Sequence, residues 1–253
     1  MKESNPEFYI KHLDIIDSTN SYARCESVAL WEEAAPCEIV VVTANEQTAG
    51  RGQRGNVWAS DAKMNLLATI MVRPQGLKVA SQFALSQLAA LAVRAAMSYY
   101  GIEVELKWPN DIYVGTRKLA GILVEVDCCS AVVDQAVIGI GLNVNQESYT
   151  PMEKQPVSMK MLLGESFDIN DVLVSLLNAF SYYYHLLQKG EYSFLASDYK
   201  RNLMGYGKAL NYRSAEGVFE AVIVDVCDSG HLCLQRSCGK QEIYAFKEVE
   251  LIL

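Results

Sequence analysis

Residues 48–58 read TAGRGQRGNVW and contain three glycines, spaced Gly50-x-Gly52-x-x-Gly55. This spacing occurs in dinucleotide-binding turns, where a strand leads directly into the first glycine and a helix begins at the third. Neither flank fits such a turn. The β-branched run EIVVVTA predicts a strand that ends near Thr43, and the residues after Gly55 lack helical periodicity and soon form another strand. We therefore exclude a dinucleotide-binding fold around this segment.

Gly50 and Gly55 are also spaced as in a P-loop, but the chain reads Asn-Val where that motif needs Lys followed by Ser or Thr. The segment is then a glycine-rich loop whose backbone can approach a ligand closely. Arg51 and Arg54 could bind the phosphates or carboxylate of that ligand. The alternative is a mobile surface loop with ordinary charges.

The composition predicts a soluble protein with a substantial core. Of the 253 residues, 51% are apolar, yet no apolar run is long enough to cross a membrane. The N-terminal residues lack the apolar stretch of a secretion signal. The seven cysteines are scattered and never spaced as Cys-x-x-Cys, so we expect reduced thiols in the cytoplasm rather than a zinc site.

The charge is distributed unevenly along the chain. The net charge of -8 argues against a general nucleic-acid or membrane binder, since both partners attract basic proteins. Residues 50–120, however, contain nine Lys or Arg against four Asp or Glu. We expect an anion-binding site in this region.

Helical and β-forming segments follow one another along most of the chain. The expected helices cover residues 20–33, 79–100, 158–164 and about 168–190. The expected strands cover residues 38–44, 65–74, 104–108, 111–127 and 131–145, with a hairpin turn at 115–116 and breaks around Pro151 and Pro156.

Beyond about Gly205 the chain changes to short β segments with a turn at residues 228–230. We interpret residues 1–204 as one domain and residues 205–253 as a small β-barrel. The fold class is α+β, with a mixed, largely antiparallel sheet packed against helices.

Polar residues in LKWPND, at 106–111, suit a nucleotide: Lys107 for phosphate, Asn110 for a base edge and Asp111 for magnesium. In the next motif, TRKLAG, Lys118 begins a strand and Gly121 leaves room beside it. The two asparagines of GIGLNVN would share one face of a strand. Each motif alone is more often a turn, a solvated lysine or a capping asparagine than part of a ligand site.

In this order, the motifs DSTN, ANEQTAGRGQRGNVW, KWPNDIYV, KLAGILVE and GIGLNVN resemble the catalytic core of biotin protein ligases. The match spans residues 17–145, and the C-terminal β segments resemble the small SH3-like domain of these enzymes. The resemblance implies a class II synthetase-like catalytic domain. It also implies the activity: ATP converts biotin to biotinyl-5'-AMP with loss of pyrophosphate, and biotin passes to one lysine of a carboxylase carrier domain.

The same resemblance implies the site residues. Biotin would be bound by Ser18, Thr19, Asn20, Gln47, Gly50, Arg51, Gly52, Gln53, Lys118 and Gly121. ATP would be bound by Arg54, Trp58, Lys107, Asn110, Asp111 and Asn143, with Trp58 against the adenine and Asp111 near Mg²⁺. Catalysis would depend on the cations Arg51, Lys107 and Lys118, because a carboxylate attacking the α-phosphate brings two anions together.

Two departures from the family pattern matter. The family commonly reads Gly-Arg-Gly-Arg-x-Gly-Arg in the glycine segment, whereas this chain has Gln53 and Asn56 at two of the arginine positions. We therefore expect weaker retention of biotinyl-AMP. Family members that repress transcription carry a helix-turn-helix domain before the first motif, and we expect no such domain and no DNA binding here.

Two other functions are alternatives. A lipoate or octanoate ligase or transferase has a related fold, but is not expected to combine this glycine segment with KWPND. A non-catalytic biotin-responsive regulator would need a DNA-binding module, or the loss of Lys107 or Lys118, which are present. Homodimers occur in the family, and no interface can be identified from the sequence.

Overall fold

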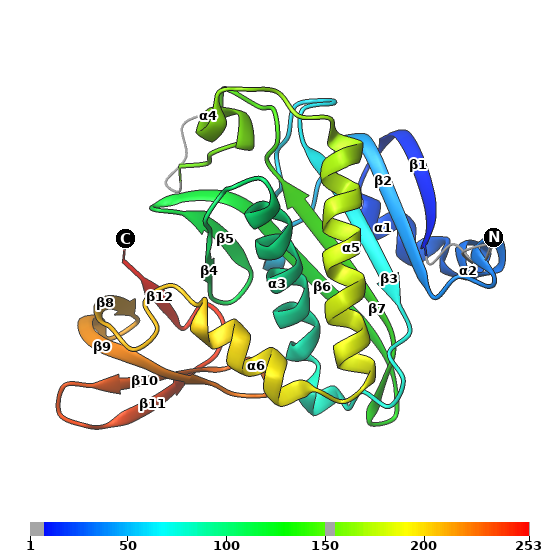
Figure 1. Ribbon diagram of the computed structural model, residues 1–253. Helices are drawn as coiled ribbons and strands as arrows, with labels where there is room; N and C mark the ends of the chain where they lie inside the picture. The colour runs from blue at the N-terminus through cyan, green and yellow to red at the C-terminus, as the bar shows by residue number, and fades with distance from the viewer. Residues whose placement is uncertain (1–7, 150–154, 253) are drawn as a thin grey trace.

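The computed structural model describes residues 8–149 and 155–252, apart from the side chain of Arg54. Its larger sheet has seven strands in the order β1-β2-β3-β7-β6-β5-β4, in which β1 and β2 are parallel and the other neighbours antiparallel (Figure 1). These strands are β1 (Phe8–Ile16), β2 (Ile39–Gln47), β3 (Leu66–Val72), β4 (Glu105–Lys107), β5 (Asp111–Val114), β6 (Arg117–Cys129) and β7 (Val132–Leu142).

Helices cover both faces of this sheet. The helices of the described residues are α1 (Thr19–Cys25), α2 (Ser27–Ala34), α3 (Phe83–Tyr99), α4 (Met159–Leu163), α5 (Ile169–Gln188) and α6 (Tyr192–Arg201), of which α6 packs against α3, α5 and the C-terminal sheet. In Figure 1, α3 and α5 lie across the front of the sheet while α1 and α2 lie behind it. The uninterrupted apolar run of β2 follows from this sandwich, because Val41 packs into the α3 side and Val40 and Val42 into the α1 side.

The residues from Val79 to Tyr99 are long and apolar enough to span a membrane. They consist of a 3-10 turn at Val79–Ser81 followed by α3. More than half of the segment is buried inside the protein, against the sheet and α5. Its apolar character is therefore explained by its place in the core.

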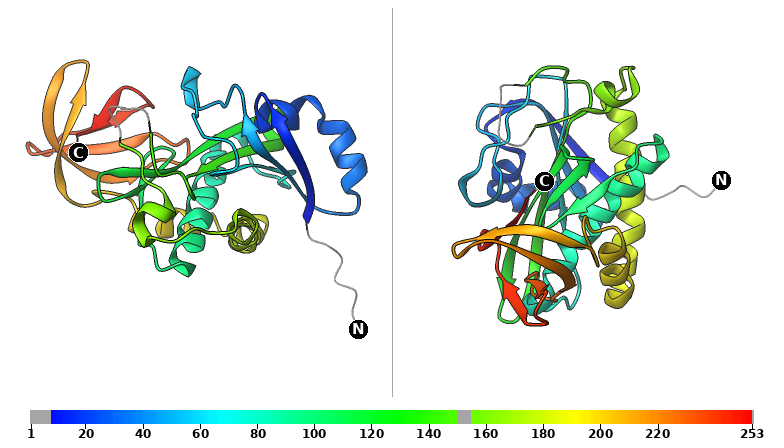
Figure 2. Two further views of the ribbon diagram at one scale, coloured as in Figure 1. Left: turned by 90° about the horizontal axis from the view of Figure 1, so that it is seen from above. Right: turned by 90° about the vertical axis from the view of Figure 1, so that its left-hand side faces the viewer.

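The C-terminal residues form a five-stranded antiparallel sheet in the order β11-β10-β9-β8-β12. Its strands are β8 (Ala209–Ser214), β9 (Gly217–Val226), β10 (Leu232–Arg236), β11 (Gln241–Tyr244) and β12 (Val249–Leu251). Figure 2 shows this sheet at the end of the molecule opposite α1 and α2. Trp108 fastens it to the larger sheet, donating from Nε1 to the Gly230 carbonyl at 2.8 Å and packing edge-on against Phe246.

This arrangement confirms the α+β class, the hairpin at residues 115–116 and the small C-terminal β unit. Its closure into an SH3-like barrel and a domain boundary at 204/205 remain predictions. The expected break at Pro151 lies outside the described residues, whereas Pro156 lies in an irregular segment.

Several expected elements differ from the structure. The expected helix over residues 20–33 is two helices separated at Glu26, and the strand β1 and the helix α6 were not expected. The strand β2 continues past Thr43 to Gln47, because β1 pairs with it as far as Gln47. The dinucleotide turn is still excluded, since only a 3-10 turn, Gln53–Gly55, precedes the antiparallel strand β3.

Candidate active site

A cleft of about 620 Å³ opens on the α1 side of the large sheet and extends to the C-terminal sheet. Strand alternation builds its floor. On β6 and β7 the apolar residues Ile122 and Ile140 face the core on the α3 side, so their neighbours Gly121 and Gly141 face the cleft. Most of the residues expected at a ligand line this cleft: Ser18, Thr19, Asn20, Gln47, Arg51, Gly52, Gln53, Trp58, Lys107, Asn110, Asp111, Lys118 and Gly121.

Glycines in β7 allow side chains to lie directly on the floor. A Cβ on Gly141 would be 2.3 Å from the ring of Trp58, and one on Gly139 would be 2.3 Å from Oδ1 of Asn20. Both distances are far below van der Waals contact. The absence of these two side chains therefore sets where Trp58 and Asn20 lie.

One end of the cleft is lined by neutral polar groups. Gln47 Oε1 accepts hydrogen bonds from the backbone N–H and the hydroxyl of Thr19, at 2.8 and 2.9 Å. The buried hydroxyl of Thr69 lies 2.8 Å from Thr19 Oγ1 and 2.6 Å from Asn20 Oδ1. Ser18 caps α1 by accepting from Ser21 N–H. These bonds fix hydroxyls and amides that can both donate and accept.

The opposite end of the cleft carries two lysines. Lys118 Nζ lies 2.7 Å from Asp111 Oδ1 and 5.5 Å from the centre of the Trp58 ring. Lys107 is buried, with Nζ 5.2 Å from the centre of the Tyr113 ring. Burial raises the pKa of the Tyr113 phenol, so this ring stays neutral beside the lysine.

The described residues contain no group of three or more His, Cys, Asp or Glu side chains placed to hold a metal ion. A metal bound through protein ligands alone is therefore not built into this part of the chain. Three carboxylates line the cleft, those of Asp111, Glu248 and Glu250, and Asp111 is the one paired with Lys118. This donor set suits Mg²⁺ that is held mainly by substrate phosphates.

The glycine-rich segment forms a short hairpin over the cleft. Trp58 N–H donates to the Gly50 carbonyl at 2.9 Å, and Gly52 N–H donates to the Asn56 carbonyl at 2.7 Å. Trp58 Nε1 is buried and has no hydrogen-bond partner among the described residues. A buried donor without a partner is costly, which favours an acceptor on a ligand in this cleft.

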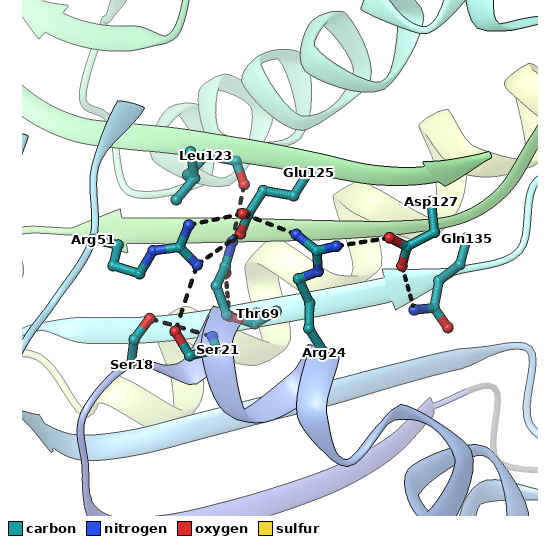
Figure 3. A network of polar contacts seen from close by, with 10 residues as sticks. Ser18, Ser21, Arg24, Arg51, Thr69, Leu123, Glu125, Asp127 and Gln135 are labelled. Carbon is teal, nitrogen blue, oxygen red and sulfur yellow. Dashed lines mark hydrogen bonds and ion pairs between the residues drawn. The ribbon is translucent and has the colours of Figure 1, made fainter. Parts of the chain in front are cut away.

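Arg51 extends from this hairpin to Glu125 on β6 (Figure 3). Its Nη1 and Nη2 atoms donate to the two carboxylate oxygens at 3.2 and 2.8 Å. The same carboxylate accepts from Arg24 Nη1 at 3.3 Å and from Asn20 Nδ2 at 3.1 Å. Arg24 also binds Asp127 at 2.8 Å.

Burial alone would raise the pKa of Glu125. The hydrogen bonds from Asn20 and Arg51, together with the charges of Arg51 and Arg24, outweigh burial and place the pKa below its ordinary value. Glu125 is therefore an ionised carboxylate at neutral pH, although only 16% of its side chain is exposed.

Three expected ligand residues do not line the cleft as described. Gly50 is buried beneath it, where a Cβ would meet the Trp58 carbonyl at 2.4 Å. The Asn143 amide donates to the Val157 carbonyl at 3.1 Å, in a buried position after the end of β7. The expectation that Asn143 and Asn145 share a strand face is therefore wrong. The side chain of Arg54 lies outside the described structure.

Several residues of the site were not expected from the sequence. Thr69 and Glu125 were not singled out, although period-two alternation places Glu125 on the same face of β6 as Gly121. The C-terminal sheet and its loops contribute Arg213, Lys247 and Glu248 to the cleft. No pattern in the sequence brings these residues to it.

Three comparisons place this architecture among known proteins. The model of the biotin/lipoate A/B protein ligase family matches residues 13–143. The bifunctional ligase/repressor BirA of Bacillus spizizenii is 30% identical over 247 residues, 96% of this chain and 74% of that protein. The biotin--[acetyl-CoA-carboxylase] ligase of Paracoccus denitrificans is 30% identical over 211 residues, 81% of this chain and 87% of that protein.

Among solved structures, the biotin protein ligase from Aquifex aeolicus in complex with biotin and ATP aligns with a TM-score of 0.77. The alignment covers 96% of this chain and 98% of that one at 22% identity. At this level of identity the likeness establishes a common fold.

Proposed function

Because the chain belongs to the biotin/lipoate A/B protein ligase family, we propose that its cleft is where ATP activates biotin for transfer to a protein lysine. The chain is a biotin--protein ligase, which forms biotinyl-5'-AMP, releases pyrophosphate and attaches biotin to a carrier domain. One observation carries the assignment of the site: a cleft with neutral polar groups at one end and Lys118 beside Asp111 at the other.

The neutral end of the cleft suits the ring of biotin. A ureido group has N–H donors and a carbonyl acceptor and carries no charge, so hydroxyls and amides can satisfy it without a counter-ion. Thr19, Asn20 and Gln47 supply such groups, already oriented by their bonds to one another and to Thr69. The biotin tail then runs over Gly121 toward Lys118.

In the first half-reaction an oxygen of the biotin carboxylate attacks the α-phosphorus of ATP, and the bond to pyrophosphate breaks. The main barrier is the repulsion between two anions, so positioned cations lower it. Lys118 contacts the carboxylate and the α-phosphate, Arg51 the acyl-phosphate, and Lys107 the leaving phosphates. Asp111 orients Lys118 and would hold a Mg²⁺ ion, which neutralises phosphate charge when bound.

Trp58 supports the adenine. Its ring lies on the bare backbone of Gly141, which leaves the other face of the ring for a planar base. The unpartnered Nε1–H of Trp58 gives the nucleotide a hydrogen-bond donor at this place.

In the second half-reaction the uncharged amine of the target lysine attacks the acyl carbon of biotinyl-5'-AMP. An amide bond forms as the attacking nitrogen loses a proton, and AMP leaves with the electron pair of the broken anhydride bond. The target is a lysine of a biotin carboxyl carrier domain. We place the enzyme in the cytoplasm and away from DNA and membranes, which accords with its net charge of -8.

The decisive experiment is ATP–pyrophosphate exchange driven separately by biotin, lipoate and octanoate, followed by transfer of label to a carrier-domain lysine. Biotin alone should support exchange. The variants Lys118→Ala and Arg51→Ala should each lose roughly 3 kcal/mol of transition-state stabilisation, or about a hundredfold in rate. Exchange with lipoate in preference to biotin would assign the chain to the other branch of its family, and near-wild-type exchange in both variants would refute the assigned roles.

A further inference from the structure

Glu125 connects the two sides of the cleft. Its carboxylate accepts four N–H groups, two from Arg51 and one each from Arg24 and Asn20 (Figure 3). An ionised carboxylate has about four lone-pair sites, so these donors saturate it. Asn20 belongs to the neutral end of the cleft and Arg51 to the glycine hairpin.

The exposed fractions of Glu125, Arg51 and Arg24 show which of the three side chains is held most firmly. The Glu125 side chain is 16% exposed, whereas those of Arg51 and Arg24 are 44% and 41% exposed. Glu125 is also held in the long strand β6, where it pairs with Val137 of β7. The carboxylate is thus the fixed member, and the arginine of the hairpin is placed by it.

We propose that Glu125 is a positioning residue, which holds the Arg51 guanidinium and the Asn20 amide in the orientations used for adenylation. This inference rests on the proposed function of the cleft. Glu125 touches no substrate. It acts through the two residues that do.

The guanidinium of Arg51 can serve Glu125 and a substrate at once. It has five N–H donors in a planar fork, and the bonds to Glu125 use one from each Nη atom. The remaining donors can bind the oxygens of an acyl-phosphate without breaking the ion pair. If Arg51 turns fully to the substrate, Arg24 remains on Glu125 and keeps that half-buried carboxylate compensated.

The amide of Asn20 is oriented by the same carboxylate. Nδ2 donates to Glu125 at 3.1 Å, and Oδ1 lies 2.6 Å from the Thr69 hydroxyl. A flipped amide would place its oxygen against the carboxylate, which is repulsive. Glu125 therefore determines that the Asn20 oxygen faces Thr69 and the floor of the cleft.

The test compares Glu125→Gln with Asp127→Asn. Asp127 is a matched control: it lies two residues away on the same strand and pairs with the same Arg24, but bonds to neither Arg51 nor Asn20. Both variants are assayed for thermal unfolding, biotin binding and biotin-driven ATP–pyrophosphate exchange. Exchange by the wild-type protein tests the proposed function separately from this inference.

Glu125→Gln should lower the exchange kcat about ten- to hundredfold, because small misplacements of a catalytic group cost that much. It should also raise the biotin KM several-fold through Asn20. Asp127→Asn should change both values less than threefold. Equal effects of the two substitutions on kcat and KM would overturn the proposal. Faster exchange in Glu125→Gln would also overturn it, because the ion pair would then restrain Arg51 from reaching the substrate.

Two further variants separate positioning from simple loss of stability. Glu125→Asp keeps the charge but shortens the side chain, so it should retain more kcat than Glu125→Gln, and it replaces that variant if Glu125→Gln does not fold. In an Arg51→Ala background, Glu125→Gln should cost less than threefold in kcat, since the residue that it positions is gone. Additive effects of the two substitutions would contradict the proposal.

Discussion

Lys118 Nζ and Asp111 Oδ1 form a 2.7 Å ion pair between the neighbouring strands β6 and β5. Asp111 and Lys118 are 13% and 25% exposed at their side chains, so water screens the pair only partly. The lysine is therefore held at a defined place on the floor of the cleft before any substrate binds.

Asp111→Asn should reduce biotin-driven pyrophosphate exchange by roughly ten- to hundredfold, because Lys118 loses its partner and Mg²⁺ loses a carboxylate. Titrating the exchange reaction with Mg²⁺ separates the two effects. We expect a higher Mg²⁺ requirement than in the wild-type protein. An unchanged Mg²⁺ dependence would limit Asp111 to orienting Lys118.

Substitutions of Gly139 and Gly141, the two glycines of β7 at the cleft, should weaken the binding of different substrates. A Cβ on Gly141 would displace the Trp58 ring, and one on Gly139 would displace the Asn20 amide. Gly141→Ala should raise the KM for ATP at least tenfold, and Gly139→Ala should do the same for biotin. Each variant serves as the control for the other in steady-state exchange assays. A rise in the KM for the same substrate in both variants would contradict the assignment of ATP and biotin to opposite ends of the cleft.

The ion pairs and hydrogen bonds of Glu125 should make the stability of the folded protein sensitive to acid. The pKa of Glu125 is lowered in the folded protein from an ordinary value of 4.5, so its contribution is complete above pH 4.5 and is lost as the pH falls through the folded pKa. The Tm gap between wild type and Glu125→Gln should stay constant near neutral pH and narrow below pH 4.5. Thermal unfolding followed by circular dichroism measures this gap, and a gap that persists undiminished in acid would count against it.

Gln53→Arg should slow the escape of biotinyl-AMP. Gln53 lines the cleft at the tip of the glycine hairpin, where a cation would face the acyl-phosphate. A charge in such a partly exposed place contributes about 1 kcal/mol, or roughly fivefold in the release rate. Release of labelled adenylate in a chase experiment gives the rate. Gln53→Met is the uncharged control, and equal rates in the two variants would exclude a charge effect.

Much of the fold could be predicted from the sequence because its signals are local. The helix that begins near residue 168, the turn at Gly115-Thr116 and the apolar run of β2 each depend on neighbouring residues, and each lies where expected. The strand β1 carries no such signal. It is an edge strand with charged residues, and its pairing with β2 joins segments distant in sequence.

The cleft was predictable in outline for a different reason. Gly121 and Lys118 stand in motifs that the resemblance interprets directly, and both line the cleft. Glu125 ends one of these motifs, but its importance depends on Arg51, which is 74 positions away. Asn143 stands inside a motif, but its side-chain amide donates to the backbone carbonyl of Val157. Contacts between distant segments decide both cases.

Glu125 and the residues that contact it lie far apart in the sequence, which affects when their contacts form during refolding. Asn20 and Glu125 are 105 positions apart, and Arg51 and Glu125 are 74 apart. Closing loops of this size costs entropy before the contacts repay it, so such contacts tend to form late in folding. Catalytic competence should therefore return in the last kinetic phase of renaturation, after the helices have re-formed.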